Sequence, residues 1–303
     1  GVHLPNCGNS IACYNATQLK EALTGISTMI GHNLIGFDLR RLEEVWDFVW
    51  QGDVEDTMIM GRLLDPAIEG GHSLKQWAIR AGEELKGDFN VEDFDRDITP
   101  EMVEYCLKDC RATWYVHQHL TGKLKKKEFS YACQDLEHSV AFMISDQIAN
   151  GFAFDFNRGC EIYAQHEQRM QEIEHELQEI FPPIVEQRWS EKTGKPLKDK
   201  ITVFNPGSRQ QVAARLEGKG AVWKTRTETG KPKVDETTLK ELSHIPEAVL
   251  VLEYLTLSKR IAMVKSWVDA VSGSRIHGYV NTCGAVTGRM THSKPNMAQI
   301  PSE

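Results

Sequence analysis

The hydrophobic positions in the first part of the chain predict a series of short elements. Apolar residues from Ala16 onward share one helical stripe, and the helix they predict leads into a short strand at Thr28–Ile30. Ser73 and the sequence Thr99-Pro100-Glu101 have the composition of helix starts, with a hydroxyl at the N-cap. The second of these helices is expected to run to about Leu120. Short strands alternating with helices favour an α/β domain.

The second part of the chain has longer amphipathic stripes. One begins after Asn157, which we expect to cap a helix that continues to about Ile180. Another covers residues 247–271, where apolar residues recur at steps of four and three. Two such helices are typical of an antiparallel pair. The polar region between residues 182 and 203 contains prolines and glycine, and it predicts a loop or small insertion.

Composition excludes several classes of protein. The chain has 303 residues, 41% hydrophobic and 26% charged, as in a soluble globular protein of two domains. No apolar run approaches the roughly 18 residues of a membrane span. The seven cysteines are scattered without a CxxC pair, which favours free thiols over a zinc site.

Charge is distributed unevenly along the chain. Residues 1–122 carry 10 Lys and Arg against 20 Asp and Glu, whereas the rest of the chain carries 25 against 23. This asymmetry indicates two domains with different roles. The overall charge of −8 does not exclude nucleic-acid binding, because phosphate contacts depend on local patches. The basic run Lys123–Lys127 marks the expected domain boundary, as a solvated linker rather than a nucleic-acid contact.

Three polar stretches of the first part together favour metal chemistry. Asp38 follows the predicted strand and a polar turn, and Asp56-Thr57 opens an apolar segment. Tyr105 and Asp109 are four residues apart, so they share one helical face. Mg²⁺ prefers carboxylate oxygens, and two such ions can stabilise both oxygens of a phosphodiester hydrolysis. A phenol one turn from a ligand carboxylate can hold the attacking water. Alone, each residue is typical of an ordinary surface acid or packing tyrosine.

These residues form a known pattern. The sequence HN-x-x-x-FD at His32–Asp38, followed by Y-x-x-x-D at Tyr105–Asp109, resembles the second and third exonuclease motifs of family A (polymerase I-type) DNA polymerases. Residues Thr287–Pro301 are similar to the TGR-x(5)-PN-x-Q-x-(I/V)-P signature that opens the palm of that family. Asn150–Asp155 and Phe204–Ser208 resemble the start of its polymerase region and an element of its thumb. The pattern is most similar to the replicative polymerases of short-tailed phages.

The resemblance implies a fold class and a domain order. A ribonuclease H-like α/β exonuclease domain is expected at residues 1–122, and a connector with the start of the polymerase region at 123–155. A mainly α-helical thumb-like region is expected at 156–272, and the first strands of a palm at 273–303. The first exonuclease motif of the family, Asp-x-Glu, would precede the helix from Ala16, yet the first acid is Glu21. The chain also ends before the polymerase carboxylates, so we expect an internal fragment.

The resemblance also implies residue roles. Asp38, Tyr105 and Asp109 would be catalytic: Asp109 would bind a metal directly, Asp38 would reach a second metal through water, and Tyr105 would orient the attacking water. The cofactor would be two Mg²⁺ ions, with Mn²⁺ able to substitute. Four residues would bind DNA. Asn33 would lie at the single-stranded 3′ end, and the primer-template duplex would be contacted by Arg289, Asn296 and Gln299. Minor-groove contacts of this kind test base-pair geometry without reading sequence.

The function implied is that of a DNA-directed DNA polymerase with 3′–5′ proofreading. Its partners would be primer-template DNA, a single-stranded 3′ end and, in the full-length enzyme, dNTP. Its location would be the cytoplasm, in a bacterial host if the protein is phage-encoded, with no membrane contact. Two alternatives stay open: a stand-alone DEDD-type exonuclease, and a catalytically incomplete fragment that only binds primer-template.

One departure from the phage pattern concerns a processivity partner. Some phage polymerases of this type carry a long basic insertion in the thumb, where a host thioredoxin docks. Here the corresponding interval, Phe181–Val203, has only 23 residues and nearly balanced charge. A stable interface takes about 800 Å² from each partner, or roughly 20–30 residues. We therefore expect no thioredoxin clamp.

Overall fold

The computed structural model describes residues 1–83, 97–190 and 192–300, which form two compact units. Unit 1 combines Gly1–Gly151 with His277–Glu303, and unit 2 is Phe152–Ile276. Both units mix helices with short strands, so the expected α/β character is present. The assignment of domains to polymerase parts stays a prediction. In the described residues, no helix has an apolar stretch long enough to cross a lipid bilayer.

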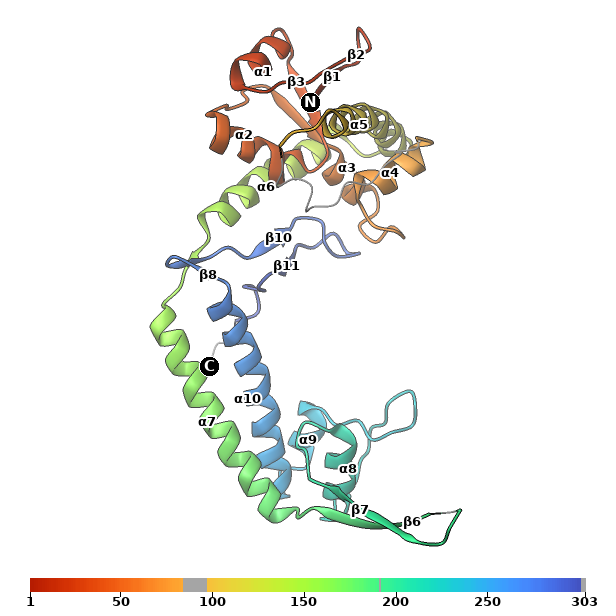
Figure 1. Cartoon of the computed structure of the whole chain (residues 1–303), viewed down its shortest axis with the longest axis vertical. Helices are drawn as coiled ribbons and strands as arrows, with labels where there is room; N and C mark the ends of the chain where they lie inside the picture. The colour runs from red at the N-terminus through yellow and green to blue at the C-terminus, as the bar shows by residue number, and fades with distance from the viewer. Residues whose placement is uncertain (84–96, 191, 301–303) are drawn as a thin grey trace. The chain divides into compact units, whose positions relative to one another are not determined.

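Unit 1 contains most of the short elements. In chain order these are β1 (Val2–Leu4), β2 (Asn9–Ile11), α1 (Ala16–Ala22), β3 (Thr28–Gly31), the π-helical turn η1 (Leu34–Asp38), α2 (Leu39–Trp46), β4 (Asp53–Asp56), α3 (Thr57–Leu64), α4 (Leu74–Ala81), α5 (Pro100–Lys126), α6 (Tyr131–Asn150), β10 (Tyr279–Asn281) and β11 (Thr291–Ser293) (Figure 1). The strands β3 and β4 are parallel, with Gly31 opposite Asp56. The pairs β1–β2 and β10–β11 are antiparallel.

Helix α5 begins where the sequence predicts and ends later. The side chain of Thr99 accepts a hydrogen bond from the backbone N–H of Met102, and Pro100 occupies the first turn. The helix continues past Leu120 to Lys126, so the basic run is its last turn and the predicted linker is wrong at this point. The physical reason is that Leu120 and Leu124, four residues apart, are both fully buried in the core of unit 1.

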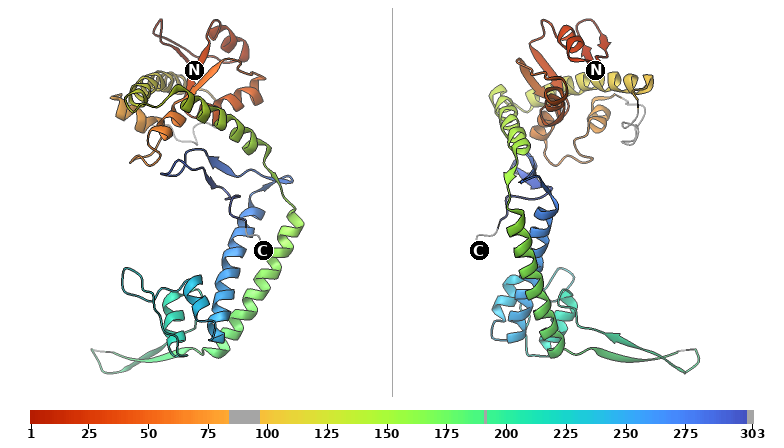
Figure 2. Two further views of the ribbon diagram at one scale, coloured as in Figure 1. Left: turned by 180° about the vertical axis from the view of Figure 1, so that it is seen from behind. Right: turned by 60° about the vertical axis from the view of Figure 1, so that its left-hand side comes forward.

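Unit 2 is built on two long helices. Its elements are β5 (Phe152–Ala153), α7 (Phe156–Ile180), β6 (Ile184–Trp189), β7 (Pro196–Thr202), α8 (Arg209–Glu217), α9 (Glu236–Glu241), α10 (Pro246–Asp269), β8 (Val271–Ser272) and β9 (Arg275–Ile276). Helices α7 and α10 lie side by side and antiparallel, as their apolar stripes predict (Figure 2). The cap of α7 is Asp155, whose carboxylate accepts from the N–H of Arg158, and not Asn157.

The region predicted as a loop before Phe204 is instead a β-hairpin. Strands β6 and β7 pair antiparallel, with Val185 opposite Ile201 and Glu186 opposite Lys200. All six residues of β6 are exposed. The strand therefore has no buried face that would give the sequence an alternating apolar and polar pattern. Strand propensity depends strongly on context, so the exposed, polar composition of this interval suggested a loop. The expectation that this short interval does not dock a thioredoxin stays a prediction.

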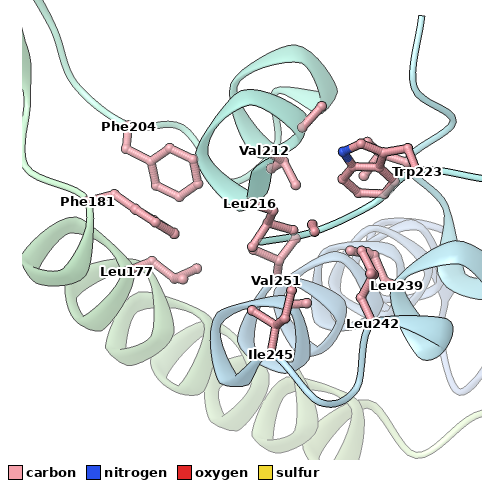
Figure 3. Close-up of a cluster of buried hydrophobic side chains, with 14 of the residues drawn as sticks. Leu177, Phe181, Phe204, Val212, Leu216, Trp223, Leu239, Leu242, Ile245 and Val251 are labelled. Atoms are coloured by element: carbon pink, nitrogen blue, oxygen red, sulfur yellow. The ribbon is translucent and has the colours of Figure 1, made fainter. Parts of the chain in front are cut away.

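The core of unit 2 lies where α7, α8, α9 and α10 meet (Figure 3). Phe204 packs edge-on against Phe181, with ring centroids 4.9 Å apart. The hydroxyl of Ser208 then caps α8 by accepting from the N–H of Gln211. The Phe204–Ser208 element therefore anchors the start of α8 to the end of α7.

Candidate active site

A buried carboxylate organises the ends of the two parallel strands. Asp56, the last residue of β4, is 1% exposed. Its Oδ1 accepts from the backbone N–H groups of Asn33 at 2.8 Å and Met58 at 2.9 Å, and its Oδ2 from Ile35 at 3.1 Å. One side chain thereby caps α3 and fixes the turn that leads from β3 into η1. The sequence marks Asp56 as an acid that opens an apolar segment, but this positioning role depends on contacts that only the fold creates.

Two histidines attach the end of β4 to the neighbouring helices. Nδ1 of His138 lies 2.7 Å from the carbonyl of Gln134, so it carries the proton and leaves Nε2 to accept the N–H of Asp56 at 2.8 Å. Nε2 of His117, on α5, pairs with the carboxylate of Glu55. Because these contacts come from α6 and α5, the strand end is held from two sides.

Asn33 starts the turn in a left-handed conformation, with φ of 61°. Its amide oxygen lies over Gly36, where a Cβ would come within 2.7 Å of it. A larger residue at position 36 would therefore displace the Asn33 side chain. The turn ends at Asp38, the last residue of η1.

The structure places Tyr105 and Asp109 together on α5, and Cys106 of the same helix lies near Asp38. Tyr105 and Asp109 lie one turn apart on α5, and hydrogen bonding from the Tyr105 side chain acts to lower the pKa of Asp109, against the larger effect of desolvation. The sulfur of Cys106, between them on the same helix, is close enough to raise the pKa of both Asp38 and Asp109.

Both acids have a raised pKa. Desolvation by the surrounding protein raises the pKa of Asp38 to about 6, although part of its side chain reaches the surface, and the charge of Asp56 adds to this shift. Desolvation likewise raises the pKa of Asp109 to about 6, against the opposing hydrogen bond from Tyr105. Oδ1 of Asp109 is buried and has no hydrogen-bond partner within the described residues. Such an oxygen is stabilised by a cation or by water.

The pKa shift of Asp109 has a consequence for stability. The folded state binds this proton more tightly than the unfolded state, so stability falls as pH rises from about 4 to about 6 and stays lower above that range. We expect Asp109→Asn to stabilise the protein by about 1–2 kcal/mol at pH 8 and to have almost no effect below pH 4. Thermal unfolding at a series of pH values measures this. An equal shift in melting temperature at all pH values would contradict it.

Asp38 and Asp109 offer the carboxylate oxygens that a hard divalent cation prefers, but two carboxylates are too few for two ions. Mg²⁺ is often held by one or two carboxylates together with several waters, which Asp38 and Asp109 could provide for one ion. Across the described ranges, no group of three or more His, Cys, Asp or Glu side chains is arranged to hold a metal. A two-ion site would require further carboxylates.

The three residues predicted to contact the duplex are exposed and lie on or beside the β10–β11 hairpin. Gly288, with φ of 75°, allows the tight turn in which the carbonyl of Arg289 accepts from the N–H groups of Gly284 and Ala285. The Arg289 side chain is left at the surface. Asn296 is exposed and its Oδ1 accepts from the N–H of Ala298, and Gln299 is exposed as well. The end of the motif, Pro301, lies outside the described residues.

Comparison with known proteins gives consistent matches. Residues 165–303 match the model of DNA polymerase family A. Among curated relatives, the "DNA-directed DNA polymerase" of Escherichia phage T7 and that of Enterobacteria phage T3 are each 28% identical over 357 residues, covering 81% of this chain and 50% of the relative. The chain thus spans half the length of these two relatives.

A solved structure extends the likeness to the fold. It is described as the POL domain of Pol1 from M. smegmatis in complex with DNA primer-template and dNTP. It matches with a TM-score of 0.65 and 18% sequence identity, covering 84% of this chain and 40% of that one.

Proposed function

We propose that the protein carrying this chain is a DNA-directed DNA polymerase, because residues 165–303 match the model of DNA polymerase family A and the chain is similar to phage members of that family. It extends a primer on a template with dNTP during replication, in the cytoplasm of a bacterial host. The observation that carries this proposal is the family match over residues 165–303, which includes the exposed Arg289, Asn296 and Gln299. The same match disfavours a stand-alone exonuclease.

We further propose that Asp38, Tyr105 and Asp109 belong to a 3′–5′ exonuclease site. What supports this is the buried Oδ1 of Asp109, which has no hydrogen-bond partner within the described residues, together with the raised pKa of both Asp109 and Asp38. When bound there, Mg²⁺ would supply activation of water and neutralisation of phosphate charge. Asp109 would hold the ion directly and Asp38 through water. Tyr105, one turn from Asp109, would hold the attacking water in line, and Asn33 would lie beside the single-stranded 3′ end.

The exonuclease proposal predicts a metal-dependent activity that removes nucleotides only from the 3′ end. The full-length protein should shorten a 5′-labelled single-stranded oligonucleotide from its 3′ end in Mg²⁺, and EDTA should stop the reaction. Residues 1–303 alone should digest it much more slowly, because two carboxylates cannot hold two ions well. Gel analysis of the labelled products measures both rates. Rapid digestion by the 303-residue chain would show that another group completes the site, and a 5′-to-3′ ladder would exclude the proposal.

The proposed duplex contact is tested separately. Arg289→Ala in the full-length protein should weaken primer-template binding by about tenfold, since a charged contact to the duplex is lost. Digestion of single strands should change little, because Arg289 is exposed and packs into no core. Binding is measured by fluorescence anisotropy and digestion by the labelled-strand assay. Equal losses in the two assays would mean that the substitution acts through folding.

A further inference from the structure

Unit 1 contains a cavity that the proposed catalytic residues do not line. Its volume is about 330 Å³, at the lower end of the range of roughly 300–1,000 Å³ for small-molecule sites. Its walls come from η1, α2, α3, α6 and β10, and neither Asp38, Tyr105 nor Asp109 is among its residues. Helix α6 packs directly on η1, α3, β4 and β10, so the walls belong to one packed body.

One side of the cavity is apolar. Four isoleucines from three elements face it: Ile35, Ile59, Ile144 and Ile148. Two of these, Ile35 and Ile59, belong to a hydrophobic cluster together with Ala141, which also lines the cavity. A surface of this kind binds the flat face of a nucleobase or a sugar through area burial rather than through hydrogen bonds.

Among the charged groups that line the cavity, Arg62 is the cation that has no carboxylate partner within the described ranges. The carboxylate of Asp56 already accepts three backbone N–H groups, and Glu44 is paired with Arg41 at 2.7 Å. Arg40 is paired with Asp146. Arg62, by contrast, makes no ion pair with any carboxylate in the described ranges, and its Nε is buried without a hydrogen-bond acceptor. The Arg62 guanidinium is therefore the group of this lining that is available to pair with an anion.

Neutral hydrogen-bonding groups complete the lining. Nδ1 of His277 lies 2.9 Å from the carbonyl of Ile148, so it carries a proton and leaves Nε2 as an acceptor. Thr282 and Asn33 add a hydroxyl and an amide. A ligand that fits this lining has an anionic group for Arg62, an apolar planar body for the isoleucines, and polar edges.

We propose that this cavity binds one deoxynucleoside monophosphate unit, with its phosphate on Arg62 and its base against the isoleucine wall. The choice of a nucleotide among anionic ligands rests on the proposed function. The unit comes either from a single DNA strand that passes the cavity or from free monophosphate, and its recognition chemistry is the same in both cases. Arginine suits the phosphate because its planar fork donates two hydrogen bonds at once.

Binding of dAMP and of an oligothymidylate to the 303-residue chain tests the proposal. The titrations are done calorimetrically at low salt in EDTA, so that no metal-dependent binding at Asp38 and Asp109 contributes. Arg62→Gln should weaken binding by about tenfold or more. Ala149→Trp, at an exposed lining position of α6, should block the cavity without changing charge. Arg111→Gln, at an exposed arginine of the same unit that does not line the cavity, is the matched control.

Each outcome decides the question. Loss of dAMP binding in both cavity variants, but not in the control, assigns the site to free monophosphate. The same pattern with the oligonucleotide alone assigns it to a unit within a strand. Binding of neither ligand, or equal binding by all variants, overturns the proposal. Inorganic phosphate that binds as tightly as dAMP and is insensitive to Ala149→Trp also overturns it. Because no catalysis is measured, failure of the exonuclease proposal would leave these results unchanged.

Discussion

Replacement of Asp109 with alanine is expected to lower the 3′–5′ exonuclease rate of the full-length protein by on the order of 10³-fold or more. The substitution removes a proposed metal ligand, and each factor of ten corresponds to about 1.4 kcal/mol of transition-state stabilisation. Primer extension on a matched template should be almost unchanged. Release of nucleotides from a labelled 3′ end, at saturating Mg²⁺, measures the effect.

Two further variants make this result specific. Asp135→Ala removes an exposed acid from α6 and should leave digestion unchanged. Asp109→Asn keeps the shape of the side chain and its hydrogen bond with Tyr105, yet it should be nearly as inactive as the alanine variant, because a neutral amide is a poor Mg²⁺ ligand. Near-normal digestion by Asp109→Ala would show that α5 carries no metal ligand and would remove the exonuclease assignment.

The second large effect concerns stability and comes from Asp56. We expect Asp56→Ala to lower the free energy of unfolding by about 3–5 kcal/mol, because three backbone N–H groups lose their acceptor in a buried place. Chemical denaturation measures this loss. The exonuclease rate should fall as well, even under conditions where the protein is folded, since the turn that positions Asp38 is no longer fixed.

Asp56→Asn separates the contribution of the hydrogen bonds from that of side-chain shape. The amide oxygen can still accept from Asn33 and Met58, while its NH₂ group would face the N–H of Ile35. We expect an intermediate loss. If the alanine variant unfolded at the same denaturant concentration as the wild type, the buried carboxylate would have no organising role.

The sequence predicts correctly where a structure depends on neighbours within one or two helical turns. Thr99-Pro100 starts α5 because the Thr99 hydroxyl can accept a hydrogen bond from the N–H three residues later, and this contact does not depend on the rest of the fold. Helices α7 and α10 follow from their apolar stripes, and Tyr105 and Asp109 share a face because four residues make about one turn. The motif resemblance indicated DNA polymerase family A before any fold was considered, and the match of residues 165–303 to the model of that family agrees with it.

Only the tertiary structure decided what depends on residues far apart in the chain. Asp38 and Asp109 are 71 positions apart, and only the fold brings both of them near Cys106 of α5. The burial of Leu124 turned a basic run into helix, and cross-strand pairing turned a polar segment into the β6–β7 hairpin. The sequence shows Asp56 simply as an acid after a strand. Its three backbone donors come from chain segments that meet only in the folded protein, because a buried carboxylate is stable only where such donors converge.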